Sequence, residues 1–323
     1  MVGIDSTSLC FLSLTLLFTP RLYSTGWQNI TGPLPTEVSL FTYLQSIALP
    51  KNDFTGTIPT QWASMRHLIN LEVHYNSLTG TIPKEFWAAN ALQNLNVGGN
   101  FLTGTLSTEV GLLTNLKGLH TFQNQLTGNF PSEIGNLEFL SFTYHQNNRF
   151  DGSIPSEIGK LGIAQELWLS ENNFTGKVPS NVGAMVAISD LRLSGNPLTG
   201  TIPDELYSLP SLARLDLYDT MITGTISTSI SQLTKLSDLR LRRTMLSGTI
   251  PTQLGLVKSL RLAWLHLTEL SGSMPSEICA NTGEDRLVVL QADCESTSAA
   301  PAVECTCCTS CCDRVTKECF ILN

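Results

Sequence analysis

Charged residues are scarce in this chain: Lys, Arg, Asp and Glu together make up 14% of its 323 residues. A typical soluble domain carries about 25%, so uncharged polar groups must cover much of the surface. Positive charge is the scarcer sign, because 19 Lys and Arg stand against 27 Asp and Glu for a net charge of −8. This balance argues against nucleic-acid binding, which needs clustered cations to displace counterions from phosphates.

A hydrophobic run long enough to span a membrane is also missing. The longest strongly apolar stretch, residues 9–18, is ten residues, and a bilayer core needs about 20. That length suits the apolar core of a secretory signal peptide, although the segment before it carries Asp5 and no Lys or Arg. We assign residues 1–24 to a signal peptide or a degenerate N-terminus, with a truncated or misread start as the alternative.

Motifs for catalysis are absent. The sequence contains no H-E-x-x-H, G-x-S-x-G, phosphate-binding loop or dinucleotide fingerprint, and its five histidines show no metal-ligand spacing. Asp190 and Asp216 could be proposed as a catalytic carboxylate pair, but the arginines that alternate with them are expected to keep both ionised. We therefore predict a protein that is not an enzyme and that holds neither cofactor nor metal.

Cysteine is nearly confined to the C-terminus. Apart from Cys10, inside the presumed signal peptide, all the cysteines lie in one segment: Cys279, Cys294, Cys305, Cys307, Cys308, Cys311, Cys312 and Cys319. An even set of this kind is expected to pair into four disulfides in an oxidising compartment, with a connectivity that the sequence leaves open. A thiolate metal cluster is the alternative, and it requires reduced cysteines.

A repeat of 24 residues organises the rest of the chain. It is marked by eleven glycines at constant spacing: Gly32, Gly56, Gly80, Gly104, Gly128, Gly152, Gly176, Gly200, Gly224, Gly248 and Gly272. Around them recurs the pattern L-x-x-L-x-L-x-x-N-x-L-T-G-x-I-P. A fixed period of 20–29 residues with this pattern is the leucine-rich-repeat signature.

Each position of the repeat has a structural role. The L-x-L pair, as in Leu191 and Leu193, places both side chains in the core of a short strand. An asparagine four residues before most of the glycines can satisfy backbone groups of its own and the adjacent coil. The later coils carry Thr220, Thr244 and Thr268 there instead, and we expect weaker bonding. Glycine permits a positive φ or close backbone approach, and the following I-P ends regular pairing before a 3₁₀ or helical turn.

These roles predict an α/β solenoid: a right-handed superhelix shaped as a horseshoe or arc, with a concave parallel β-sheet and short helical or 3₁₀ turns on its convex side. The solenoid is expected over residues 25–293, with a cysteine-rich cap or tail over 294–323. Leu287 and Val289 fall where one further coil would place its L-x-L pair. Thr121, Thr143 and His145 stand at core positions and are expected to find hydrogen-bond partners rather than to act chemically.

The T-G-x-I-P block resembles the plant-specific class of leucine-rich repeats, found in receptor-kinase ectodomains, polygalacturonase-inhibitor-like proteins and secreted algal proteins. The resemblance covers about Thr25 to Asp293 and implies a second, side sheet formed by the L-T-G-x-I segments. The cysteine-rich end is similar to that of secreted leucine-rich-repeat proteins of unicellular algae. The paired cysteines that usually precede the first repeat are missing, and only Trp27 remains of that cap, so the chain is either a fragment or has a degenerate cap. Sequons at Asn29 and Asn173 suit an extracellular glycoprotein.

Candidate ligand-binding residues lie at positions predicted to face outward from the concave sheet. Aromatic residues dominate its N-terminal part and charged residues its C-terminal part, and exposed aromatics on a rigid surface are typical anchors for a protein, peptide or sugar. Ordinary solvent-facing strand residues are the alternative interpretation. The candidates are His74, Tyr75, His120, Phe122, Phe142, Tyr144, Trp168, Tyr218, Arg240, Arg242, Arg243 and Trp264.

The charged zone alternates in sign, with Asp190, Arg214 and Asp238 in one column and Arg192, Asp216 and Arg240 in the next. Cross-strand ion pairs that stabilise the sheet are the simplest explanation. Arg240-Leu241-Arg242 also resembles the R-x-R pair with which some plant leucine-rich-repeat receptors hold the carboxylate terminus of a peptide, and Arg243 adds a third guanidinium. Nearby aspartates could neutralise these arginines.

The function that we predict is an extracellular, non-enzymatic scaffold that binds a protein, peptide or glycan in recognition, adhesion or defence. It is expected to be secreted or at the cell surface, without a transmembrane segment in this chain and without nucleic acid as a partner. One alternative is an ectodomain-like fragment of a receptor. The other is an ice-binding or cell-wall protein that uses the repeated Thr-Gly-Thr segments of the side sheet, as at Thr79 to Thr81.

Overall fold

The computed structural model describes residues 2–3, 21–24, 28–282, 287–295, 303–313 and 316–321. The apolar core of the predicted signal peptide lies outside the described residues, with Cys10, Thr25 and Trp27. The chain divides into two compact units, Met1–Asp151 and Gly152–Asn323. No helix among the described residues combines the length and the hydrophobicity that crossing a membrane requires.

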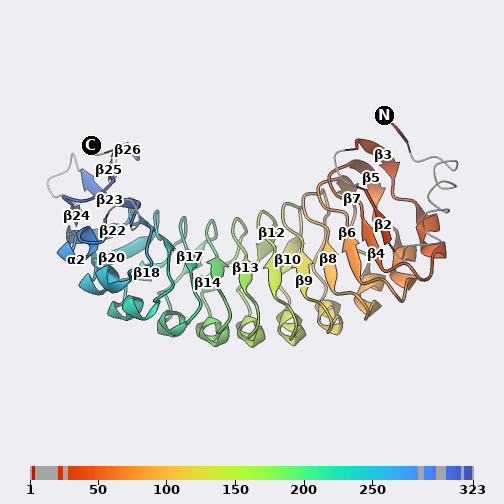
Figure 1. The fold of residues 1–323 in the computed structure, drawn as a ribbon, viewed down its shortest axis with the longest axis horizontal. Coiled ribbons are helices and arrows are strands. Elements are labelled where there is room, and N and C mark those ends of the chain that lie inside the picture. The colour runs from red at the N-terminus through yellow and green to blue at the C-terminus, as the bar shows by residue number, and fades with distance from the viewer. Residues whose placement is uncertain are drawn as a thin grey trace. The chain divides into compact units, whose positions relative to one another are not determined.

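The first unit stacks short parallel strands in chain order, so that every coil adds one strand to the large sheet (Figure 1). Its large-sheet strands are β2 (Arg21–Tyr23), β4 (Ser46–Ala48), β6 (Asn70–Glu72), β8 (Asn94–Asn96), β9 (Gly118–His120) and β11 (Phe142–Tyr144). Side strands pair as β1 (Val2–Gly3), β3 (Ile30–Pro33), β5 (Asp53–Thr57) and β7 (Ser77–Thr79), and as β10 (Thr127–Asn129) with β12 (Arg149–Asp151). The 3₁₀ turns are η1 (Thr36–Leu40), η2 (Thr60–Ser64), η3 (Lys84–Ala88), η4 (Thr108–Leu112) and η5 (Ser132–Asn136).

The second unit repeats this arrangement. Its large-sheet strands are β13 (Glu166–Trp168), β15 (Asp190–Arg192), β17 (Arg214–Asp216), β19 (Asp238–Arg240), β21 (Leu262–Trp264), β23 (Val289–Glu295), β25 (Ser310–Asp313) and β26 (Cys319–Ile321). Its side strands are β14 (Gly176–Lys177) with β16 (Leu198–Thr199), then β18 (Thr223–Gly224), β20 (Met245–Thr249), β22 (Glu269–Ser273) and β24 (Val303–Glu304). The helical turns are η6 (Ser156–Lys160), η7 (Ser180–Ala184), η8 (Asp204–Ser208), η9 (Thr228–Gln232), η10 (Thr252–Leu256) and the α-helix α2 (Ser276–Cys279). The predicted solenoid with side strands and 3₁₀ turns is thus confirmed.

The core is a stack of identical positions. Leu191, Leu215 and Leu239 pair in register across β15, β17 and β19, and each is at most 1% exposed. A fully buried leucine contributes about 2 kcal/mol, so the ladder of leucines is the main stabilising element of every coil. Eight of the ten 3₁₀ turns follow a proline, whose missing N–H removes one unpaired donor. The other two follow Ser107 and Ser227, whose hydroxyls accept a bond from the second residue of the turn instead.

The repeat glycines all have a positive φ, and most of them also lie close to a side chain of the preceding coil. All eleven have φ between +70° and +102°, a region in which side chains are strained. At Gly80 an added Cβ would also lie 2.9 Å from the Cγ2 methyl of Thr57 in the preceding coil. The threonine after one glycine therefore covers the next glycine, which gives the Thr-Gly-Thr pattern a structural cause.

The asparagine ladder bonds each coil to the one before it. The side-chain amide of Asn76 donates to the carbonyl oxygens of Val73 and, one coil earlier, Leu49, both at 3.0 Å, while its oxygen accepts the N–H of Phe54 at 3.1 Å. Thr220, Thr244 and Thr268 each donate only to a carbonyl of their own coil, at 2.7–2.9 Å, among the residues described. The predicted weakening in these three coils is confirmed, since the bonds to the preceding coil are lost.

The C-terminal cap differs from the prediction in its register. Ala263 of β21 pairs with Leu290 of β23 rather than with Leu287, so Leu290 and Ala292 occupy the core positions that we assigned to Leu287 and Val289. The shift follows from α2 and its connection, which replace the usual 3₁₀ turn and lengthen this coil by three residues.

Asp293 ends the ladder of backbone bonds. It is 1% exposed, and its carboxylate accepts the N–H groups of Leu267 at 2.7 Å and Thr268 at 3.0 Å. In earlier coils the corresponding N–H groups bond to carbonyls of the next coil, as Lys51 does to His74. Asp293 thus supplies the acceptors that a following coil would have provided.

All eight C-terminal cysteines pair, as predicted. The bonds join Cys279 to Cys307, Cys294 to Cys311, Cys305 to Cys308 and Cys312 to Cys319. Two of them connect the last coils to β25 and the segment before it, and β26 closes the sheet as an antiparallel strand on β25. His266 lies near Cys312 and Cys319 in a constellation that could suit a metal, but both sulfurs are held in a disulfide.

Candidate ligand-binding surfaces

Two outward surfaces of the large sheet carry the predicted ligand-binding residues. We define the first-unit face as four positions in each of five consecutive coils, namely 46, 48, 50 and 51 and their equivalents at steps of 24 up to 142, 144, 146 and 147. The second-unit face comprises the same four positions from 166, 168, 170 and 171 up to 262, 264, 266 and 267. Charged residues occupy two of the twenty positions on the first-unit face, Lys51 and Glu72, and eleven of the twenty on the second-unit face.

Aromatic side chains of the first-unit face contact one another. The rings of Tyr75 and Phe122 meet edge to face with centroids 5.6 Å apart, and His74 packs against Tyr75 at 5.7 Å. His120 stacks on Tyr144 at 4.4 Å. Of the predicted anchors, Tyr75 and Phe142 are exposed, whereas Phe122 is buried at 9% and acts as support.

A glycine pair forms the floor under two of these rings. A Cβ at Gly98 would lie 2.4 Å from the ring of Phe122, and one at Gly99 would lie 2.5 Å from the ring of Tyr75. Tyr75 and Phe122 therefore lean from neighbouring coils over bare backbone. The Gly98-Gly99 pair is visible in the sequence. The sequence alone does not show which aromatic rings pack on it.

The two histidines of this face are neutral at pH 7. Burial, with a smaller contribution from His74, lowers the pKa of His120 to about 4. Burial also lowers the pKa of His74, with a smaller contribution from Lys51. The first-unit face is thus an aromatic surface with little charge.

The three polar core residues of the first unit form one cluster. The hydroxyl of Thr121 lies 2.7 Å from Nδ1 of His145, and the hydroxyl of Thr143 lies 2.7 Å from its Nε2. His145 is fully buried against the edges of Phe130 and Phe150, and burial lowers its pKa to about 3. The expectation of hydrogen-bond partners is met, and the cluster has no access to the surface.

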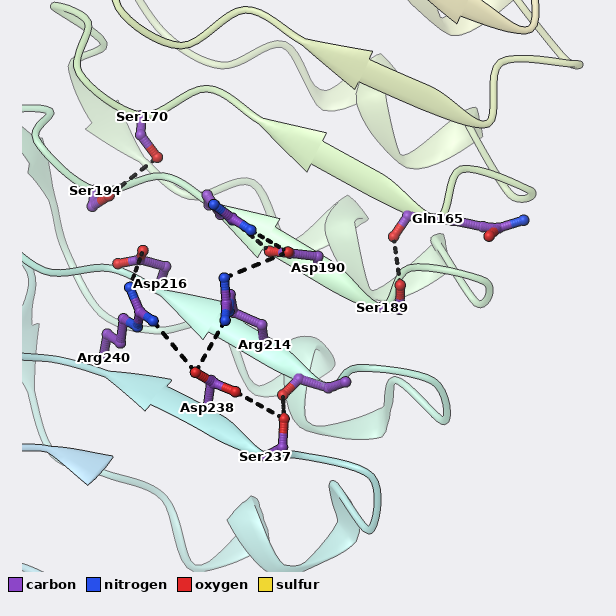
Figure 2. A network of polar contacts seen from close by, with 12 residues as sticks. Gln165, Ser170, Ser189, Asp190, Ser194, Arg214, Asp216, Ser237, Asp238 and Arg240 are labelled. Carbon is purple, nitrogen blue, oxygen red and sulfur yellow. Dashed lines mark hydrogen bonds and ion pairs between the residues drawn. The ribbon is translucent and has the colours of Figure 1, made fainter. Parts of the chain in front are cut away.

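The second-unit face carries a ladder of ion pairs (Figure 2). Arg192 binds Asp190 through two hydrogen bonds of 2.7 and 2.9 Å. Arg214 lies between Asp190 at 4.0 Å and Asp238 at 3.1 Å. Arg240 lies 3.4 Å from Asp238 and 4.0 Å from Asp216. The predicted cross-strand pairing is met in part: Arg214 and Arg240 reach aspartates of neighbouring strands, whereas the pairs Arg192–Asp190 and Arg240–Asp238 lie within one strand and join the two columns.

The pKa of Asp216 is governed more by burial than by the neighbouring arginines, contrary to our expectation from the sequence. Burial raises the pKa of its carboxyl to about 6, and Arg240, Arg192 and Arg214 offset only part of that effect. It is 4% exposed, and its Oδ1 makes no hydrogen bond within the described chain. The group is still ionised at pH 7, but desolvation is the larger influence.

Tryptophan rings of this face are covered by guanidinium groups. Arg192 lies 3.7 Å from the centroid of Trp168, and Arg240 lies 4.6 Å from that of Trp264. Such cation–π contacts contribute about 0.5 to 2 kcal/mol, depending on burial. The two tryptophans therefore serve as platforms for the protein's own arginines, and their role as ligand anchors stays a prediction.

Arg242 has a different environment from the other arginines. Its guanidinium lies 4.8 Å from the ring centroid of Tyr218 and 4.9 Å from that of Trp264. In the part of the chain that the structure describes, no carboxylate lies within ion-pairing distance of it, whereas Arg243 pairs with Asp219 at 3.7 Å. Of the three arginines in the predicted carboxylate site, only Arg242 is left without an acidic partner there.

Unused polar atoms surround Arg242. The indole N–H of Trp264, Nδ1 of the buried His266 and Nε of Arg242 itself make no hydrogen bond within the described residues. Burial lowers the pKa of His266 to about 4, against the opposing influence of Asp293. The site thus holds one cation, a neutral imidazole and an indole donor, which sequence reasoning had identified only in part.

Two pockets border the faces near positions of unusual backbone. Tyr75 and Arg243 both adopt a positive φ, of 55° and 52°, at the same position of their coils. Tyr75 borders a pocket of about 330 Å³ in the first unit, together with Asn29, Lys51, Asn52 and Asp53. Arg243 borders one of about 400 Å³ in the second unit, together with Asp219, Leu267, Thr268 and Lys317. The two sequon asparagines, Asn29 and Asn173, are exposed.

Comparison with known proteins supports the fold. No curated protein sequence matches the chain. The sequence model of the Leucine Rich Repeat family matches residues 164–185 and 188–209.

Solved structures of plant proteins are similar over most of the chain. The ectodomain of the receptor kinase GASSHO1/SCHENGEN3 from Arabidopsis thaliana, in complex with CASPARIAN STRIP INTEGRITY FACTOR 2, is 26% identical with a TM-score of 0.74, covering 88% of this chain and 38% of that one. The Arabidopsis HAESA ectodomain, in complex with an extended IDA peptide hormone, is 29% identical with a TM-score of 0.72, covering 82% and 48%.

A plant ice-binding protein is 27% identical with a TM-score of 0.62, covering 72% of this chain and 74% of that one. This chain spans less than half of the two receptor ectodomains. By repeat, by sheet architecture and by these similarities, the fold is that of the leucine-rich-repeat solenoids.

Proposed function

We propose that this protein is an extracellular, non-enzymatic binding module that captures a peptide or protein on its second-unit face, with Arg242 receiving a carboxylate of the ligand. The observation that carries the proposal is the isolation of one cation. Arg192, Arg214, Arg240 and Arg243 all have an acidic partner, and Arg242 has two aromatic rings instead. The four disulfides suit an oxidising extracellular setting.

The geometry around Arg242 favours a carboxylate over other ligands. Two rings hold the guanidinium in place, so little conformational entropy is lost when a planar, bidentate partner binds. The neutral His266 adds no competing charge. The neighbouring ion pairs leave little net charge, which favours a single carboxylate over a polyanion.

The known structures support a peptide as the source of that carboxylate. The HAESA ectodomain was solved in complex with a peptide hormone, and the GASSHO1/SCHENGEN3 ectodomain in complex with CASPARIAN STRIP INTEGRITY FACTOR 2. Such a role suits a secreted protein and an ectodomain of a larger receptor equally. The cysteine-rich tail, which resembles that of secreted algal proteins, remains a prediction about relationship and not about ligand.

A peptide library tests the proposal directly. The full, disulfide-bonded protein is presented with random dodecapeptides that carry either a free C-terminal carboxylate or a C-terminal amide. We expect enrichment from the carboxylate library alone, and a loss of about tenfold or more in affinity for the enriched peptides in Arg242→Gln. Arg261→Gln, which removes an exposed arginine of the same unit, is the matched control and should bind as the wild type does.

The proposal fails if both libraries enrich equally. It also fails if Arg242→Gln and Arg261→Gln bind the enriched peptides alike. Thermal melting of the three proteins separates loss of binding from loss of folding, because a folded Arg242→Gln that still binds leaves no role for the guanidinium.

Ice binding is a second candidate, favoured by the similarity to the plant ice-binding protein and by the threonine rows. Structural features weigh against it. Hydroxyls of the rows already donate to glycine carbonyls of the preceding coil, as Thr79 does to Gly56 at 3.2 Å. The side strands form separate short sheets, and a hollow of about 590 Å³ interrupts the surface near Thr57, Thr81 and Thr105. Thermal hysteresis that is abolished by Thr81→Tyr with Thr105→Tyr would establish ice binding, and its absence in the wild type would exclude it.

A further inference from the structure

The first-unit face has the composition of a site for an uncharged, hydroxyl-rich ligand. Lys51 and Glu72 are its only charged positions, and they have opposite sign. Its histidines are neutral. A ligand with net charge would therefore find no complementary field on this face, in contrast to the second-unit face.

Amide groups line the same surface beside the rings. Asn94 donates to Asn70 at 2.7 Å, and the side-chain oxygen of Asn96 accepts the N–H of Gly98 at 3.2 Å. Asn96 pairs with His120 across the sheet, so the amide row directly adjoins the aromatic cluster. Amides offer both donors and acceptors without charge, which suits hydroxyl groups.

The ring of Tyr75 joins this surface to a pocket. It is 44% exposed, and Gly99 and Phe122 support it on the sheet side. The pocket that it borders measures about 330 Å³, and ligand pockets start at about 300 Å³. Asn29, Lys51, Asn52 and Asp53 also line it, so a flat ring stands beside amides, an ammonium and a carboxylate, and the two charges cancel.

From this arrangement we propose that the first-unit face binds a neutral polysaccharide, with one pyranose stacked on Tyr75 in the pocket and the next sugars running over the aromatic and amide rows. A pyranose has a C–H face that packs on an aromatic ring and a rim of hydroxyls that needs uncharged hydrogen-bonding groups. A charged peptide terminus would meet neither requirement well. A purely apolar ligand would leave the amides unpaired. The site is independent of the carboxylate site at Arg242.

Affinity electrophoresis tests the proposal with defined polymers. The full chain, produced without N-glycosylation so that Asn29 is unmodified, is run through native gels that contain laminarin, hydroxyethylcellulose, galactomannan or xyloglucan, and through one that contains polygalacturonate. We expect at least one neutral polymer to retard the wild type and polygalacturonate to retard it less. Tyr75→Ala should weaken that binding by about tenfold or more, as the removal of an anchoring ring does.

Matched variants make the result specific. Tyr43→Ala removes another exposed tyrosine of the same unit, 79% accessible and outside the face, and should bind as the wild type does. Tyr75→Phe keeps the ring and should retain most of the binding, which separates stacking from loss of folding. Arg242→Gln should be retarded normally, since the two sites are separate.

The proposal is overturned if none of the four neutral polymers retards the wild type, or if polygalacturonate retards it more strongly than they do. It is also overturned if Tyr75→Ala and Tyr43→Ala migrate alike. A negative result in the polysaccharide gels does not affect the proposed peptide binding at Arg242. A negative result with the peptide libraries does not affect the proposed polysaccharide binding at Tyr75.

Discussion

The two faces of the large sheet use the same backbone for opposite chemistry. In the first unit the face is aromatic, amide-rich and nearly uncharged, and the polar exceptions lie inside, where Thr121, Thr143 and His145 bond to one another. In the second unit the core positions of the strands stay apolar, mostly leucine, and alternating Asp and Arg lie on the outward side. The repeat therefore fixes the residues that build the coil but not the outward-facing residues. We expect those outward residues to determine which ligand binds.

The difference also shows how each unit balances its polar groups. Buried neutral groups in the first unit need complete hydrogen bonding, because an unpaired one costs about 1 to 3 kcal/mol. Half-buried ions in the second unit retain contact with water and contribute less. We expect stability changes to be largest for the buried hydrogen-bonding groups and smallest for the surface ions, and the following predictions test that ranking.

The largest effect should come from the ladder between coils. Asn100 donates to Val73, Val97 and Gly98 and accepts from Leu78, all at 3.0–3.1 Å. Asn100→Thr keeps only one of these bonds, on the pattern of Thr244, and should lower the free energy of unfolding by about 2 to 4 kcal/mol. Urea denaturation measures the loss, and hydrogen exchange should show faster exchange of the Leu78 amide.

The reverse substitution is the control. Thr244→Asn should stabilise the second unit by about 1 kcal/mol, since it can form the bonds that the threonine lacks. If Asn100→Thr is as stable as the wild type, hydrogen bonds between coils do not distinguish the two kinds of coil.

Much of this fold was predictable from periodicity, because constant spacing of Gly, Asn and Leu leaves one way to stack the coils. The same regularity failed at the last coil, where extending the period put Leu287 and Val289 at the two core positions of the strand, whereas Leu287 is buried ahead of that strand. The structure places Leu290 and Ala292 at those two positions, since α2 breaks the period. Extrapolation along a repeat holds only while the turn is unchanged.

The candidate sites were less predictable, because they depend on side-chain geometry between coils. The sequence identified Arg240, Arg242 and Arg243 as a group, but it could not show that aspartates neutralise two of them. It also treated Trp168 and Phe122 as exposed, whereas Arg192 covers one and the sheet buries the other. Which partner a side chain chooses among several within reach is decided by packing.

The second prediction concerns the buried cluster of the first unit. His145→Leu alone should destabilise the protein by about 1 to 3 kcal/mol, because the hydroxyls of Thr121 and Thr143 lose their partner. Replacing all three by leucine restores the consensus core and should come within about 1 kcal/mol of the wild type. Urea denaturation at pH 7 compares the two variants.

The cluster also has a pH signature. The pKa of His145 is lowered to about 3 in the folded protein, from an ordinary value of about 6.5. Its contribution to stability is therefore complete above pH 6.5 and is lost as the pH falls toward 3. The triple leucine variant should lose less stability over that range, and an identical acid profile would contradict a buried neutral histidine.

The third prediction concerns the buried carboxyl of the second unit, and its sign is opposite. Burial raises the pKa of Asp216 to about 6, so the folded protein holds this proton more tightly than the unfolded chain does. Relative to Asp216→Asn, the wild type should be less stable at pH 7 by about 3 kcal/mol, because the pKa rises by about two units and each unit corresponds to about 1.4 kcal/mol. The two proteins should become equally stable as the pH falls from 6 to below 4. Thermal melting of both proteins at pH 7 and pH 4 measures this difference. A pH-independent difference would show that the arginines, rather than burial, dominate the carboxyl.

The smallest effect should come from the ion-pair ladder itself. Asp190, Arg214 and Asp238 have side chains 17–27% exposed, so salt reaches them. Raising NaCl from 0.05 to 1 M should destabilise β17 by less than about 1 kcal/mol, the upper end for pairs near a surface. Strand β8 of the first unit, which has no ion pair among its described residues, should not change. Hydrogen exchange of the Leu215 and Leu95 amides compares the strands within one sample. Equal salt dependence at both amides would mean that the two faces differ in their ligands but not in how they hold the sheet together.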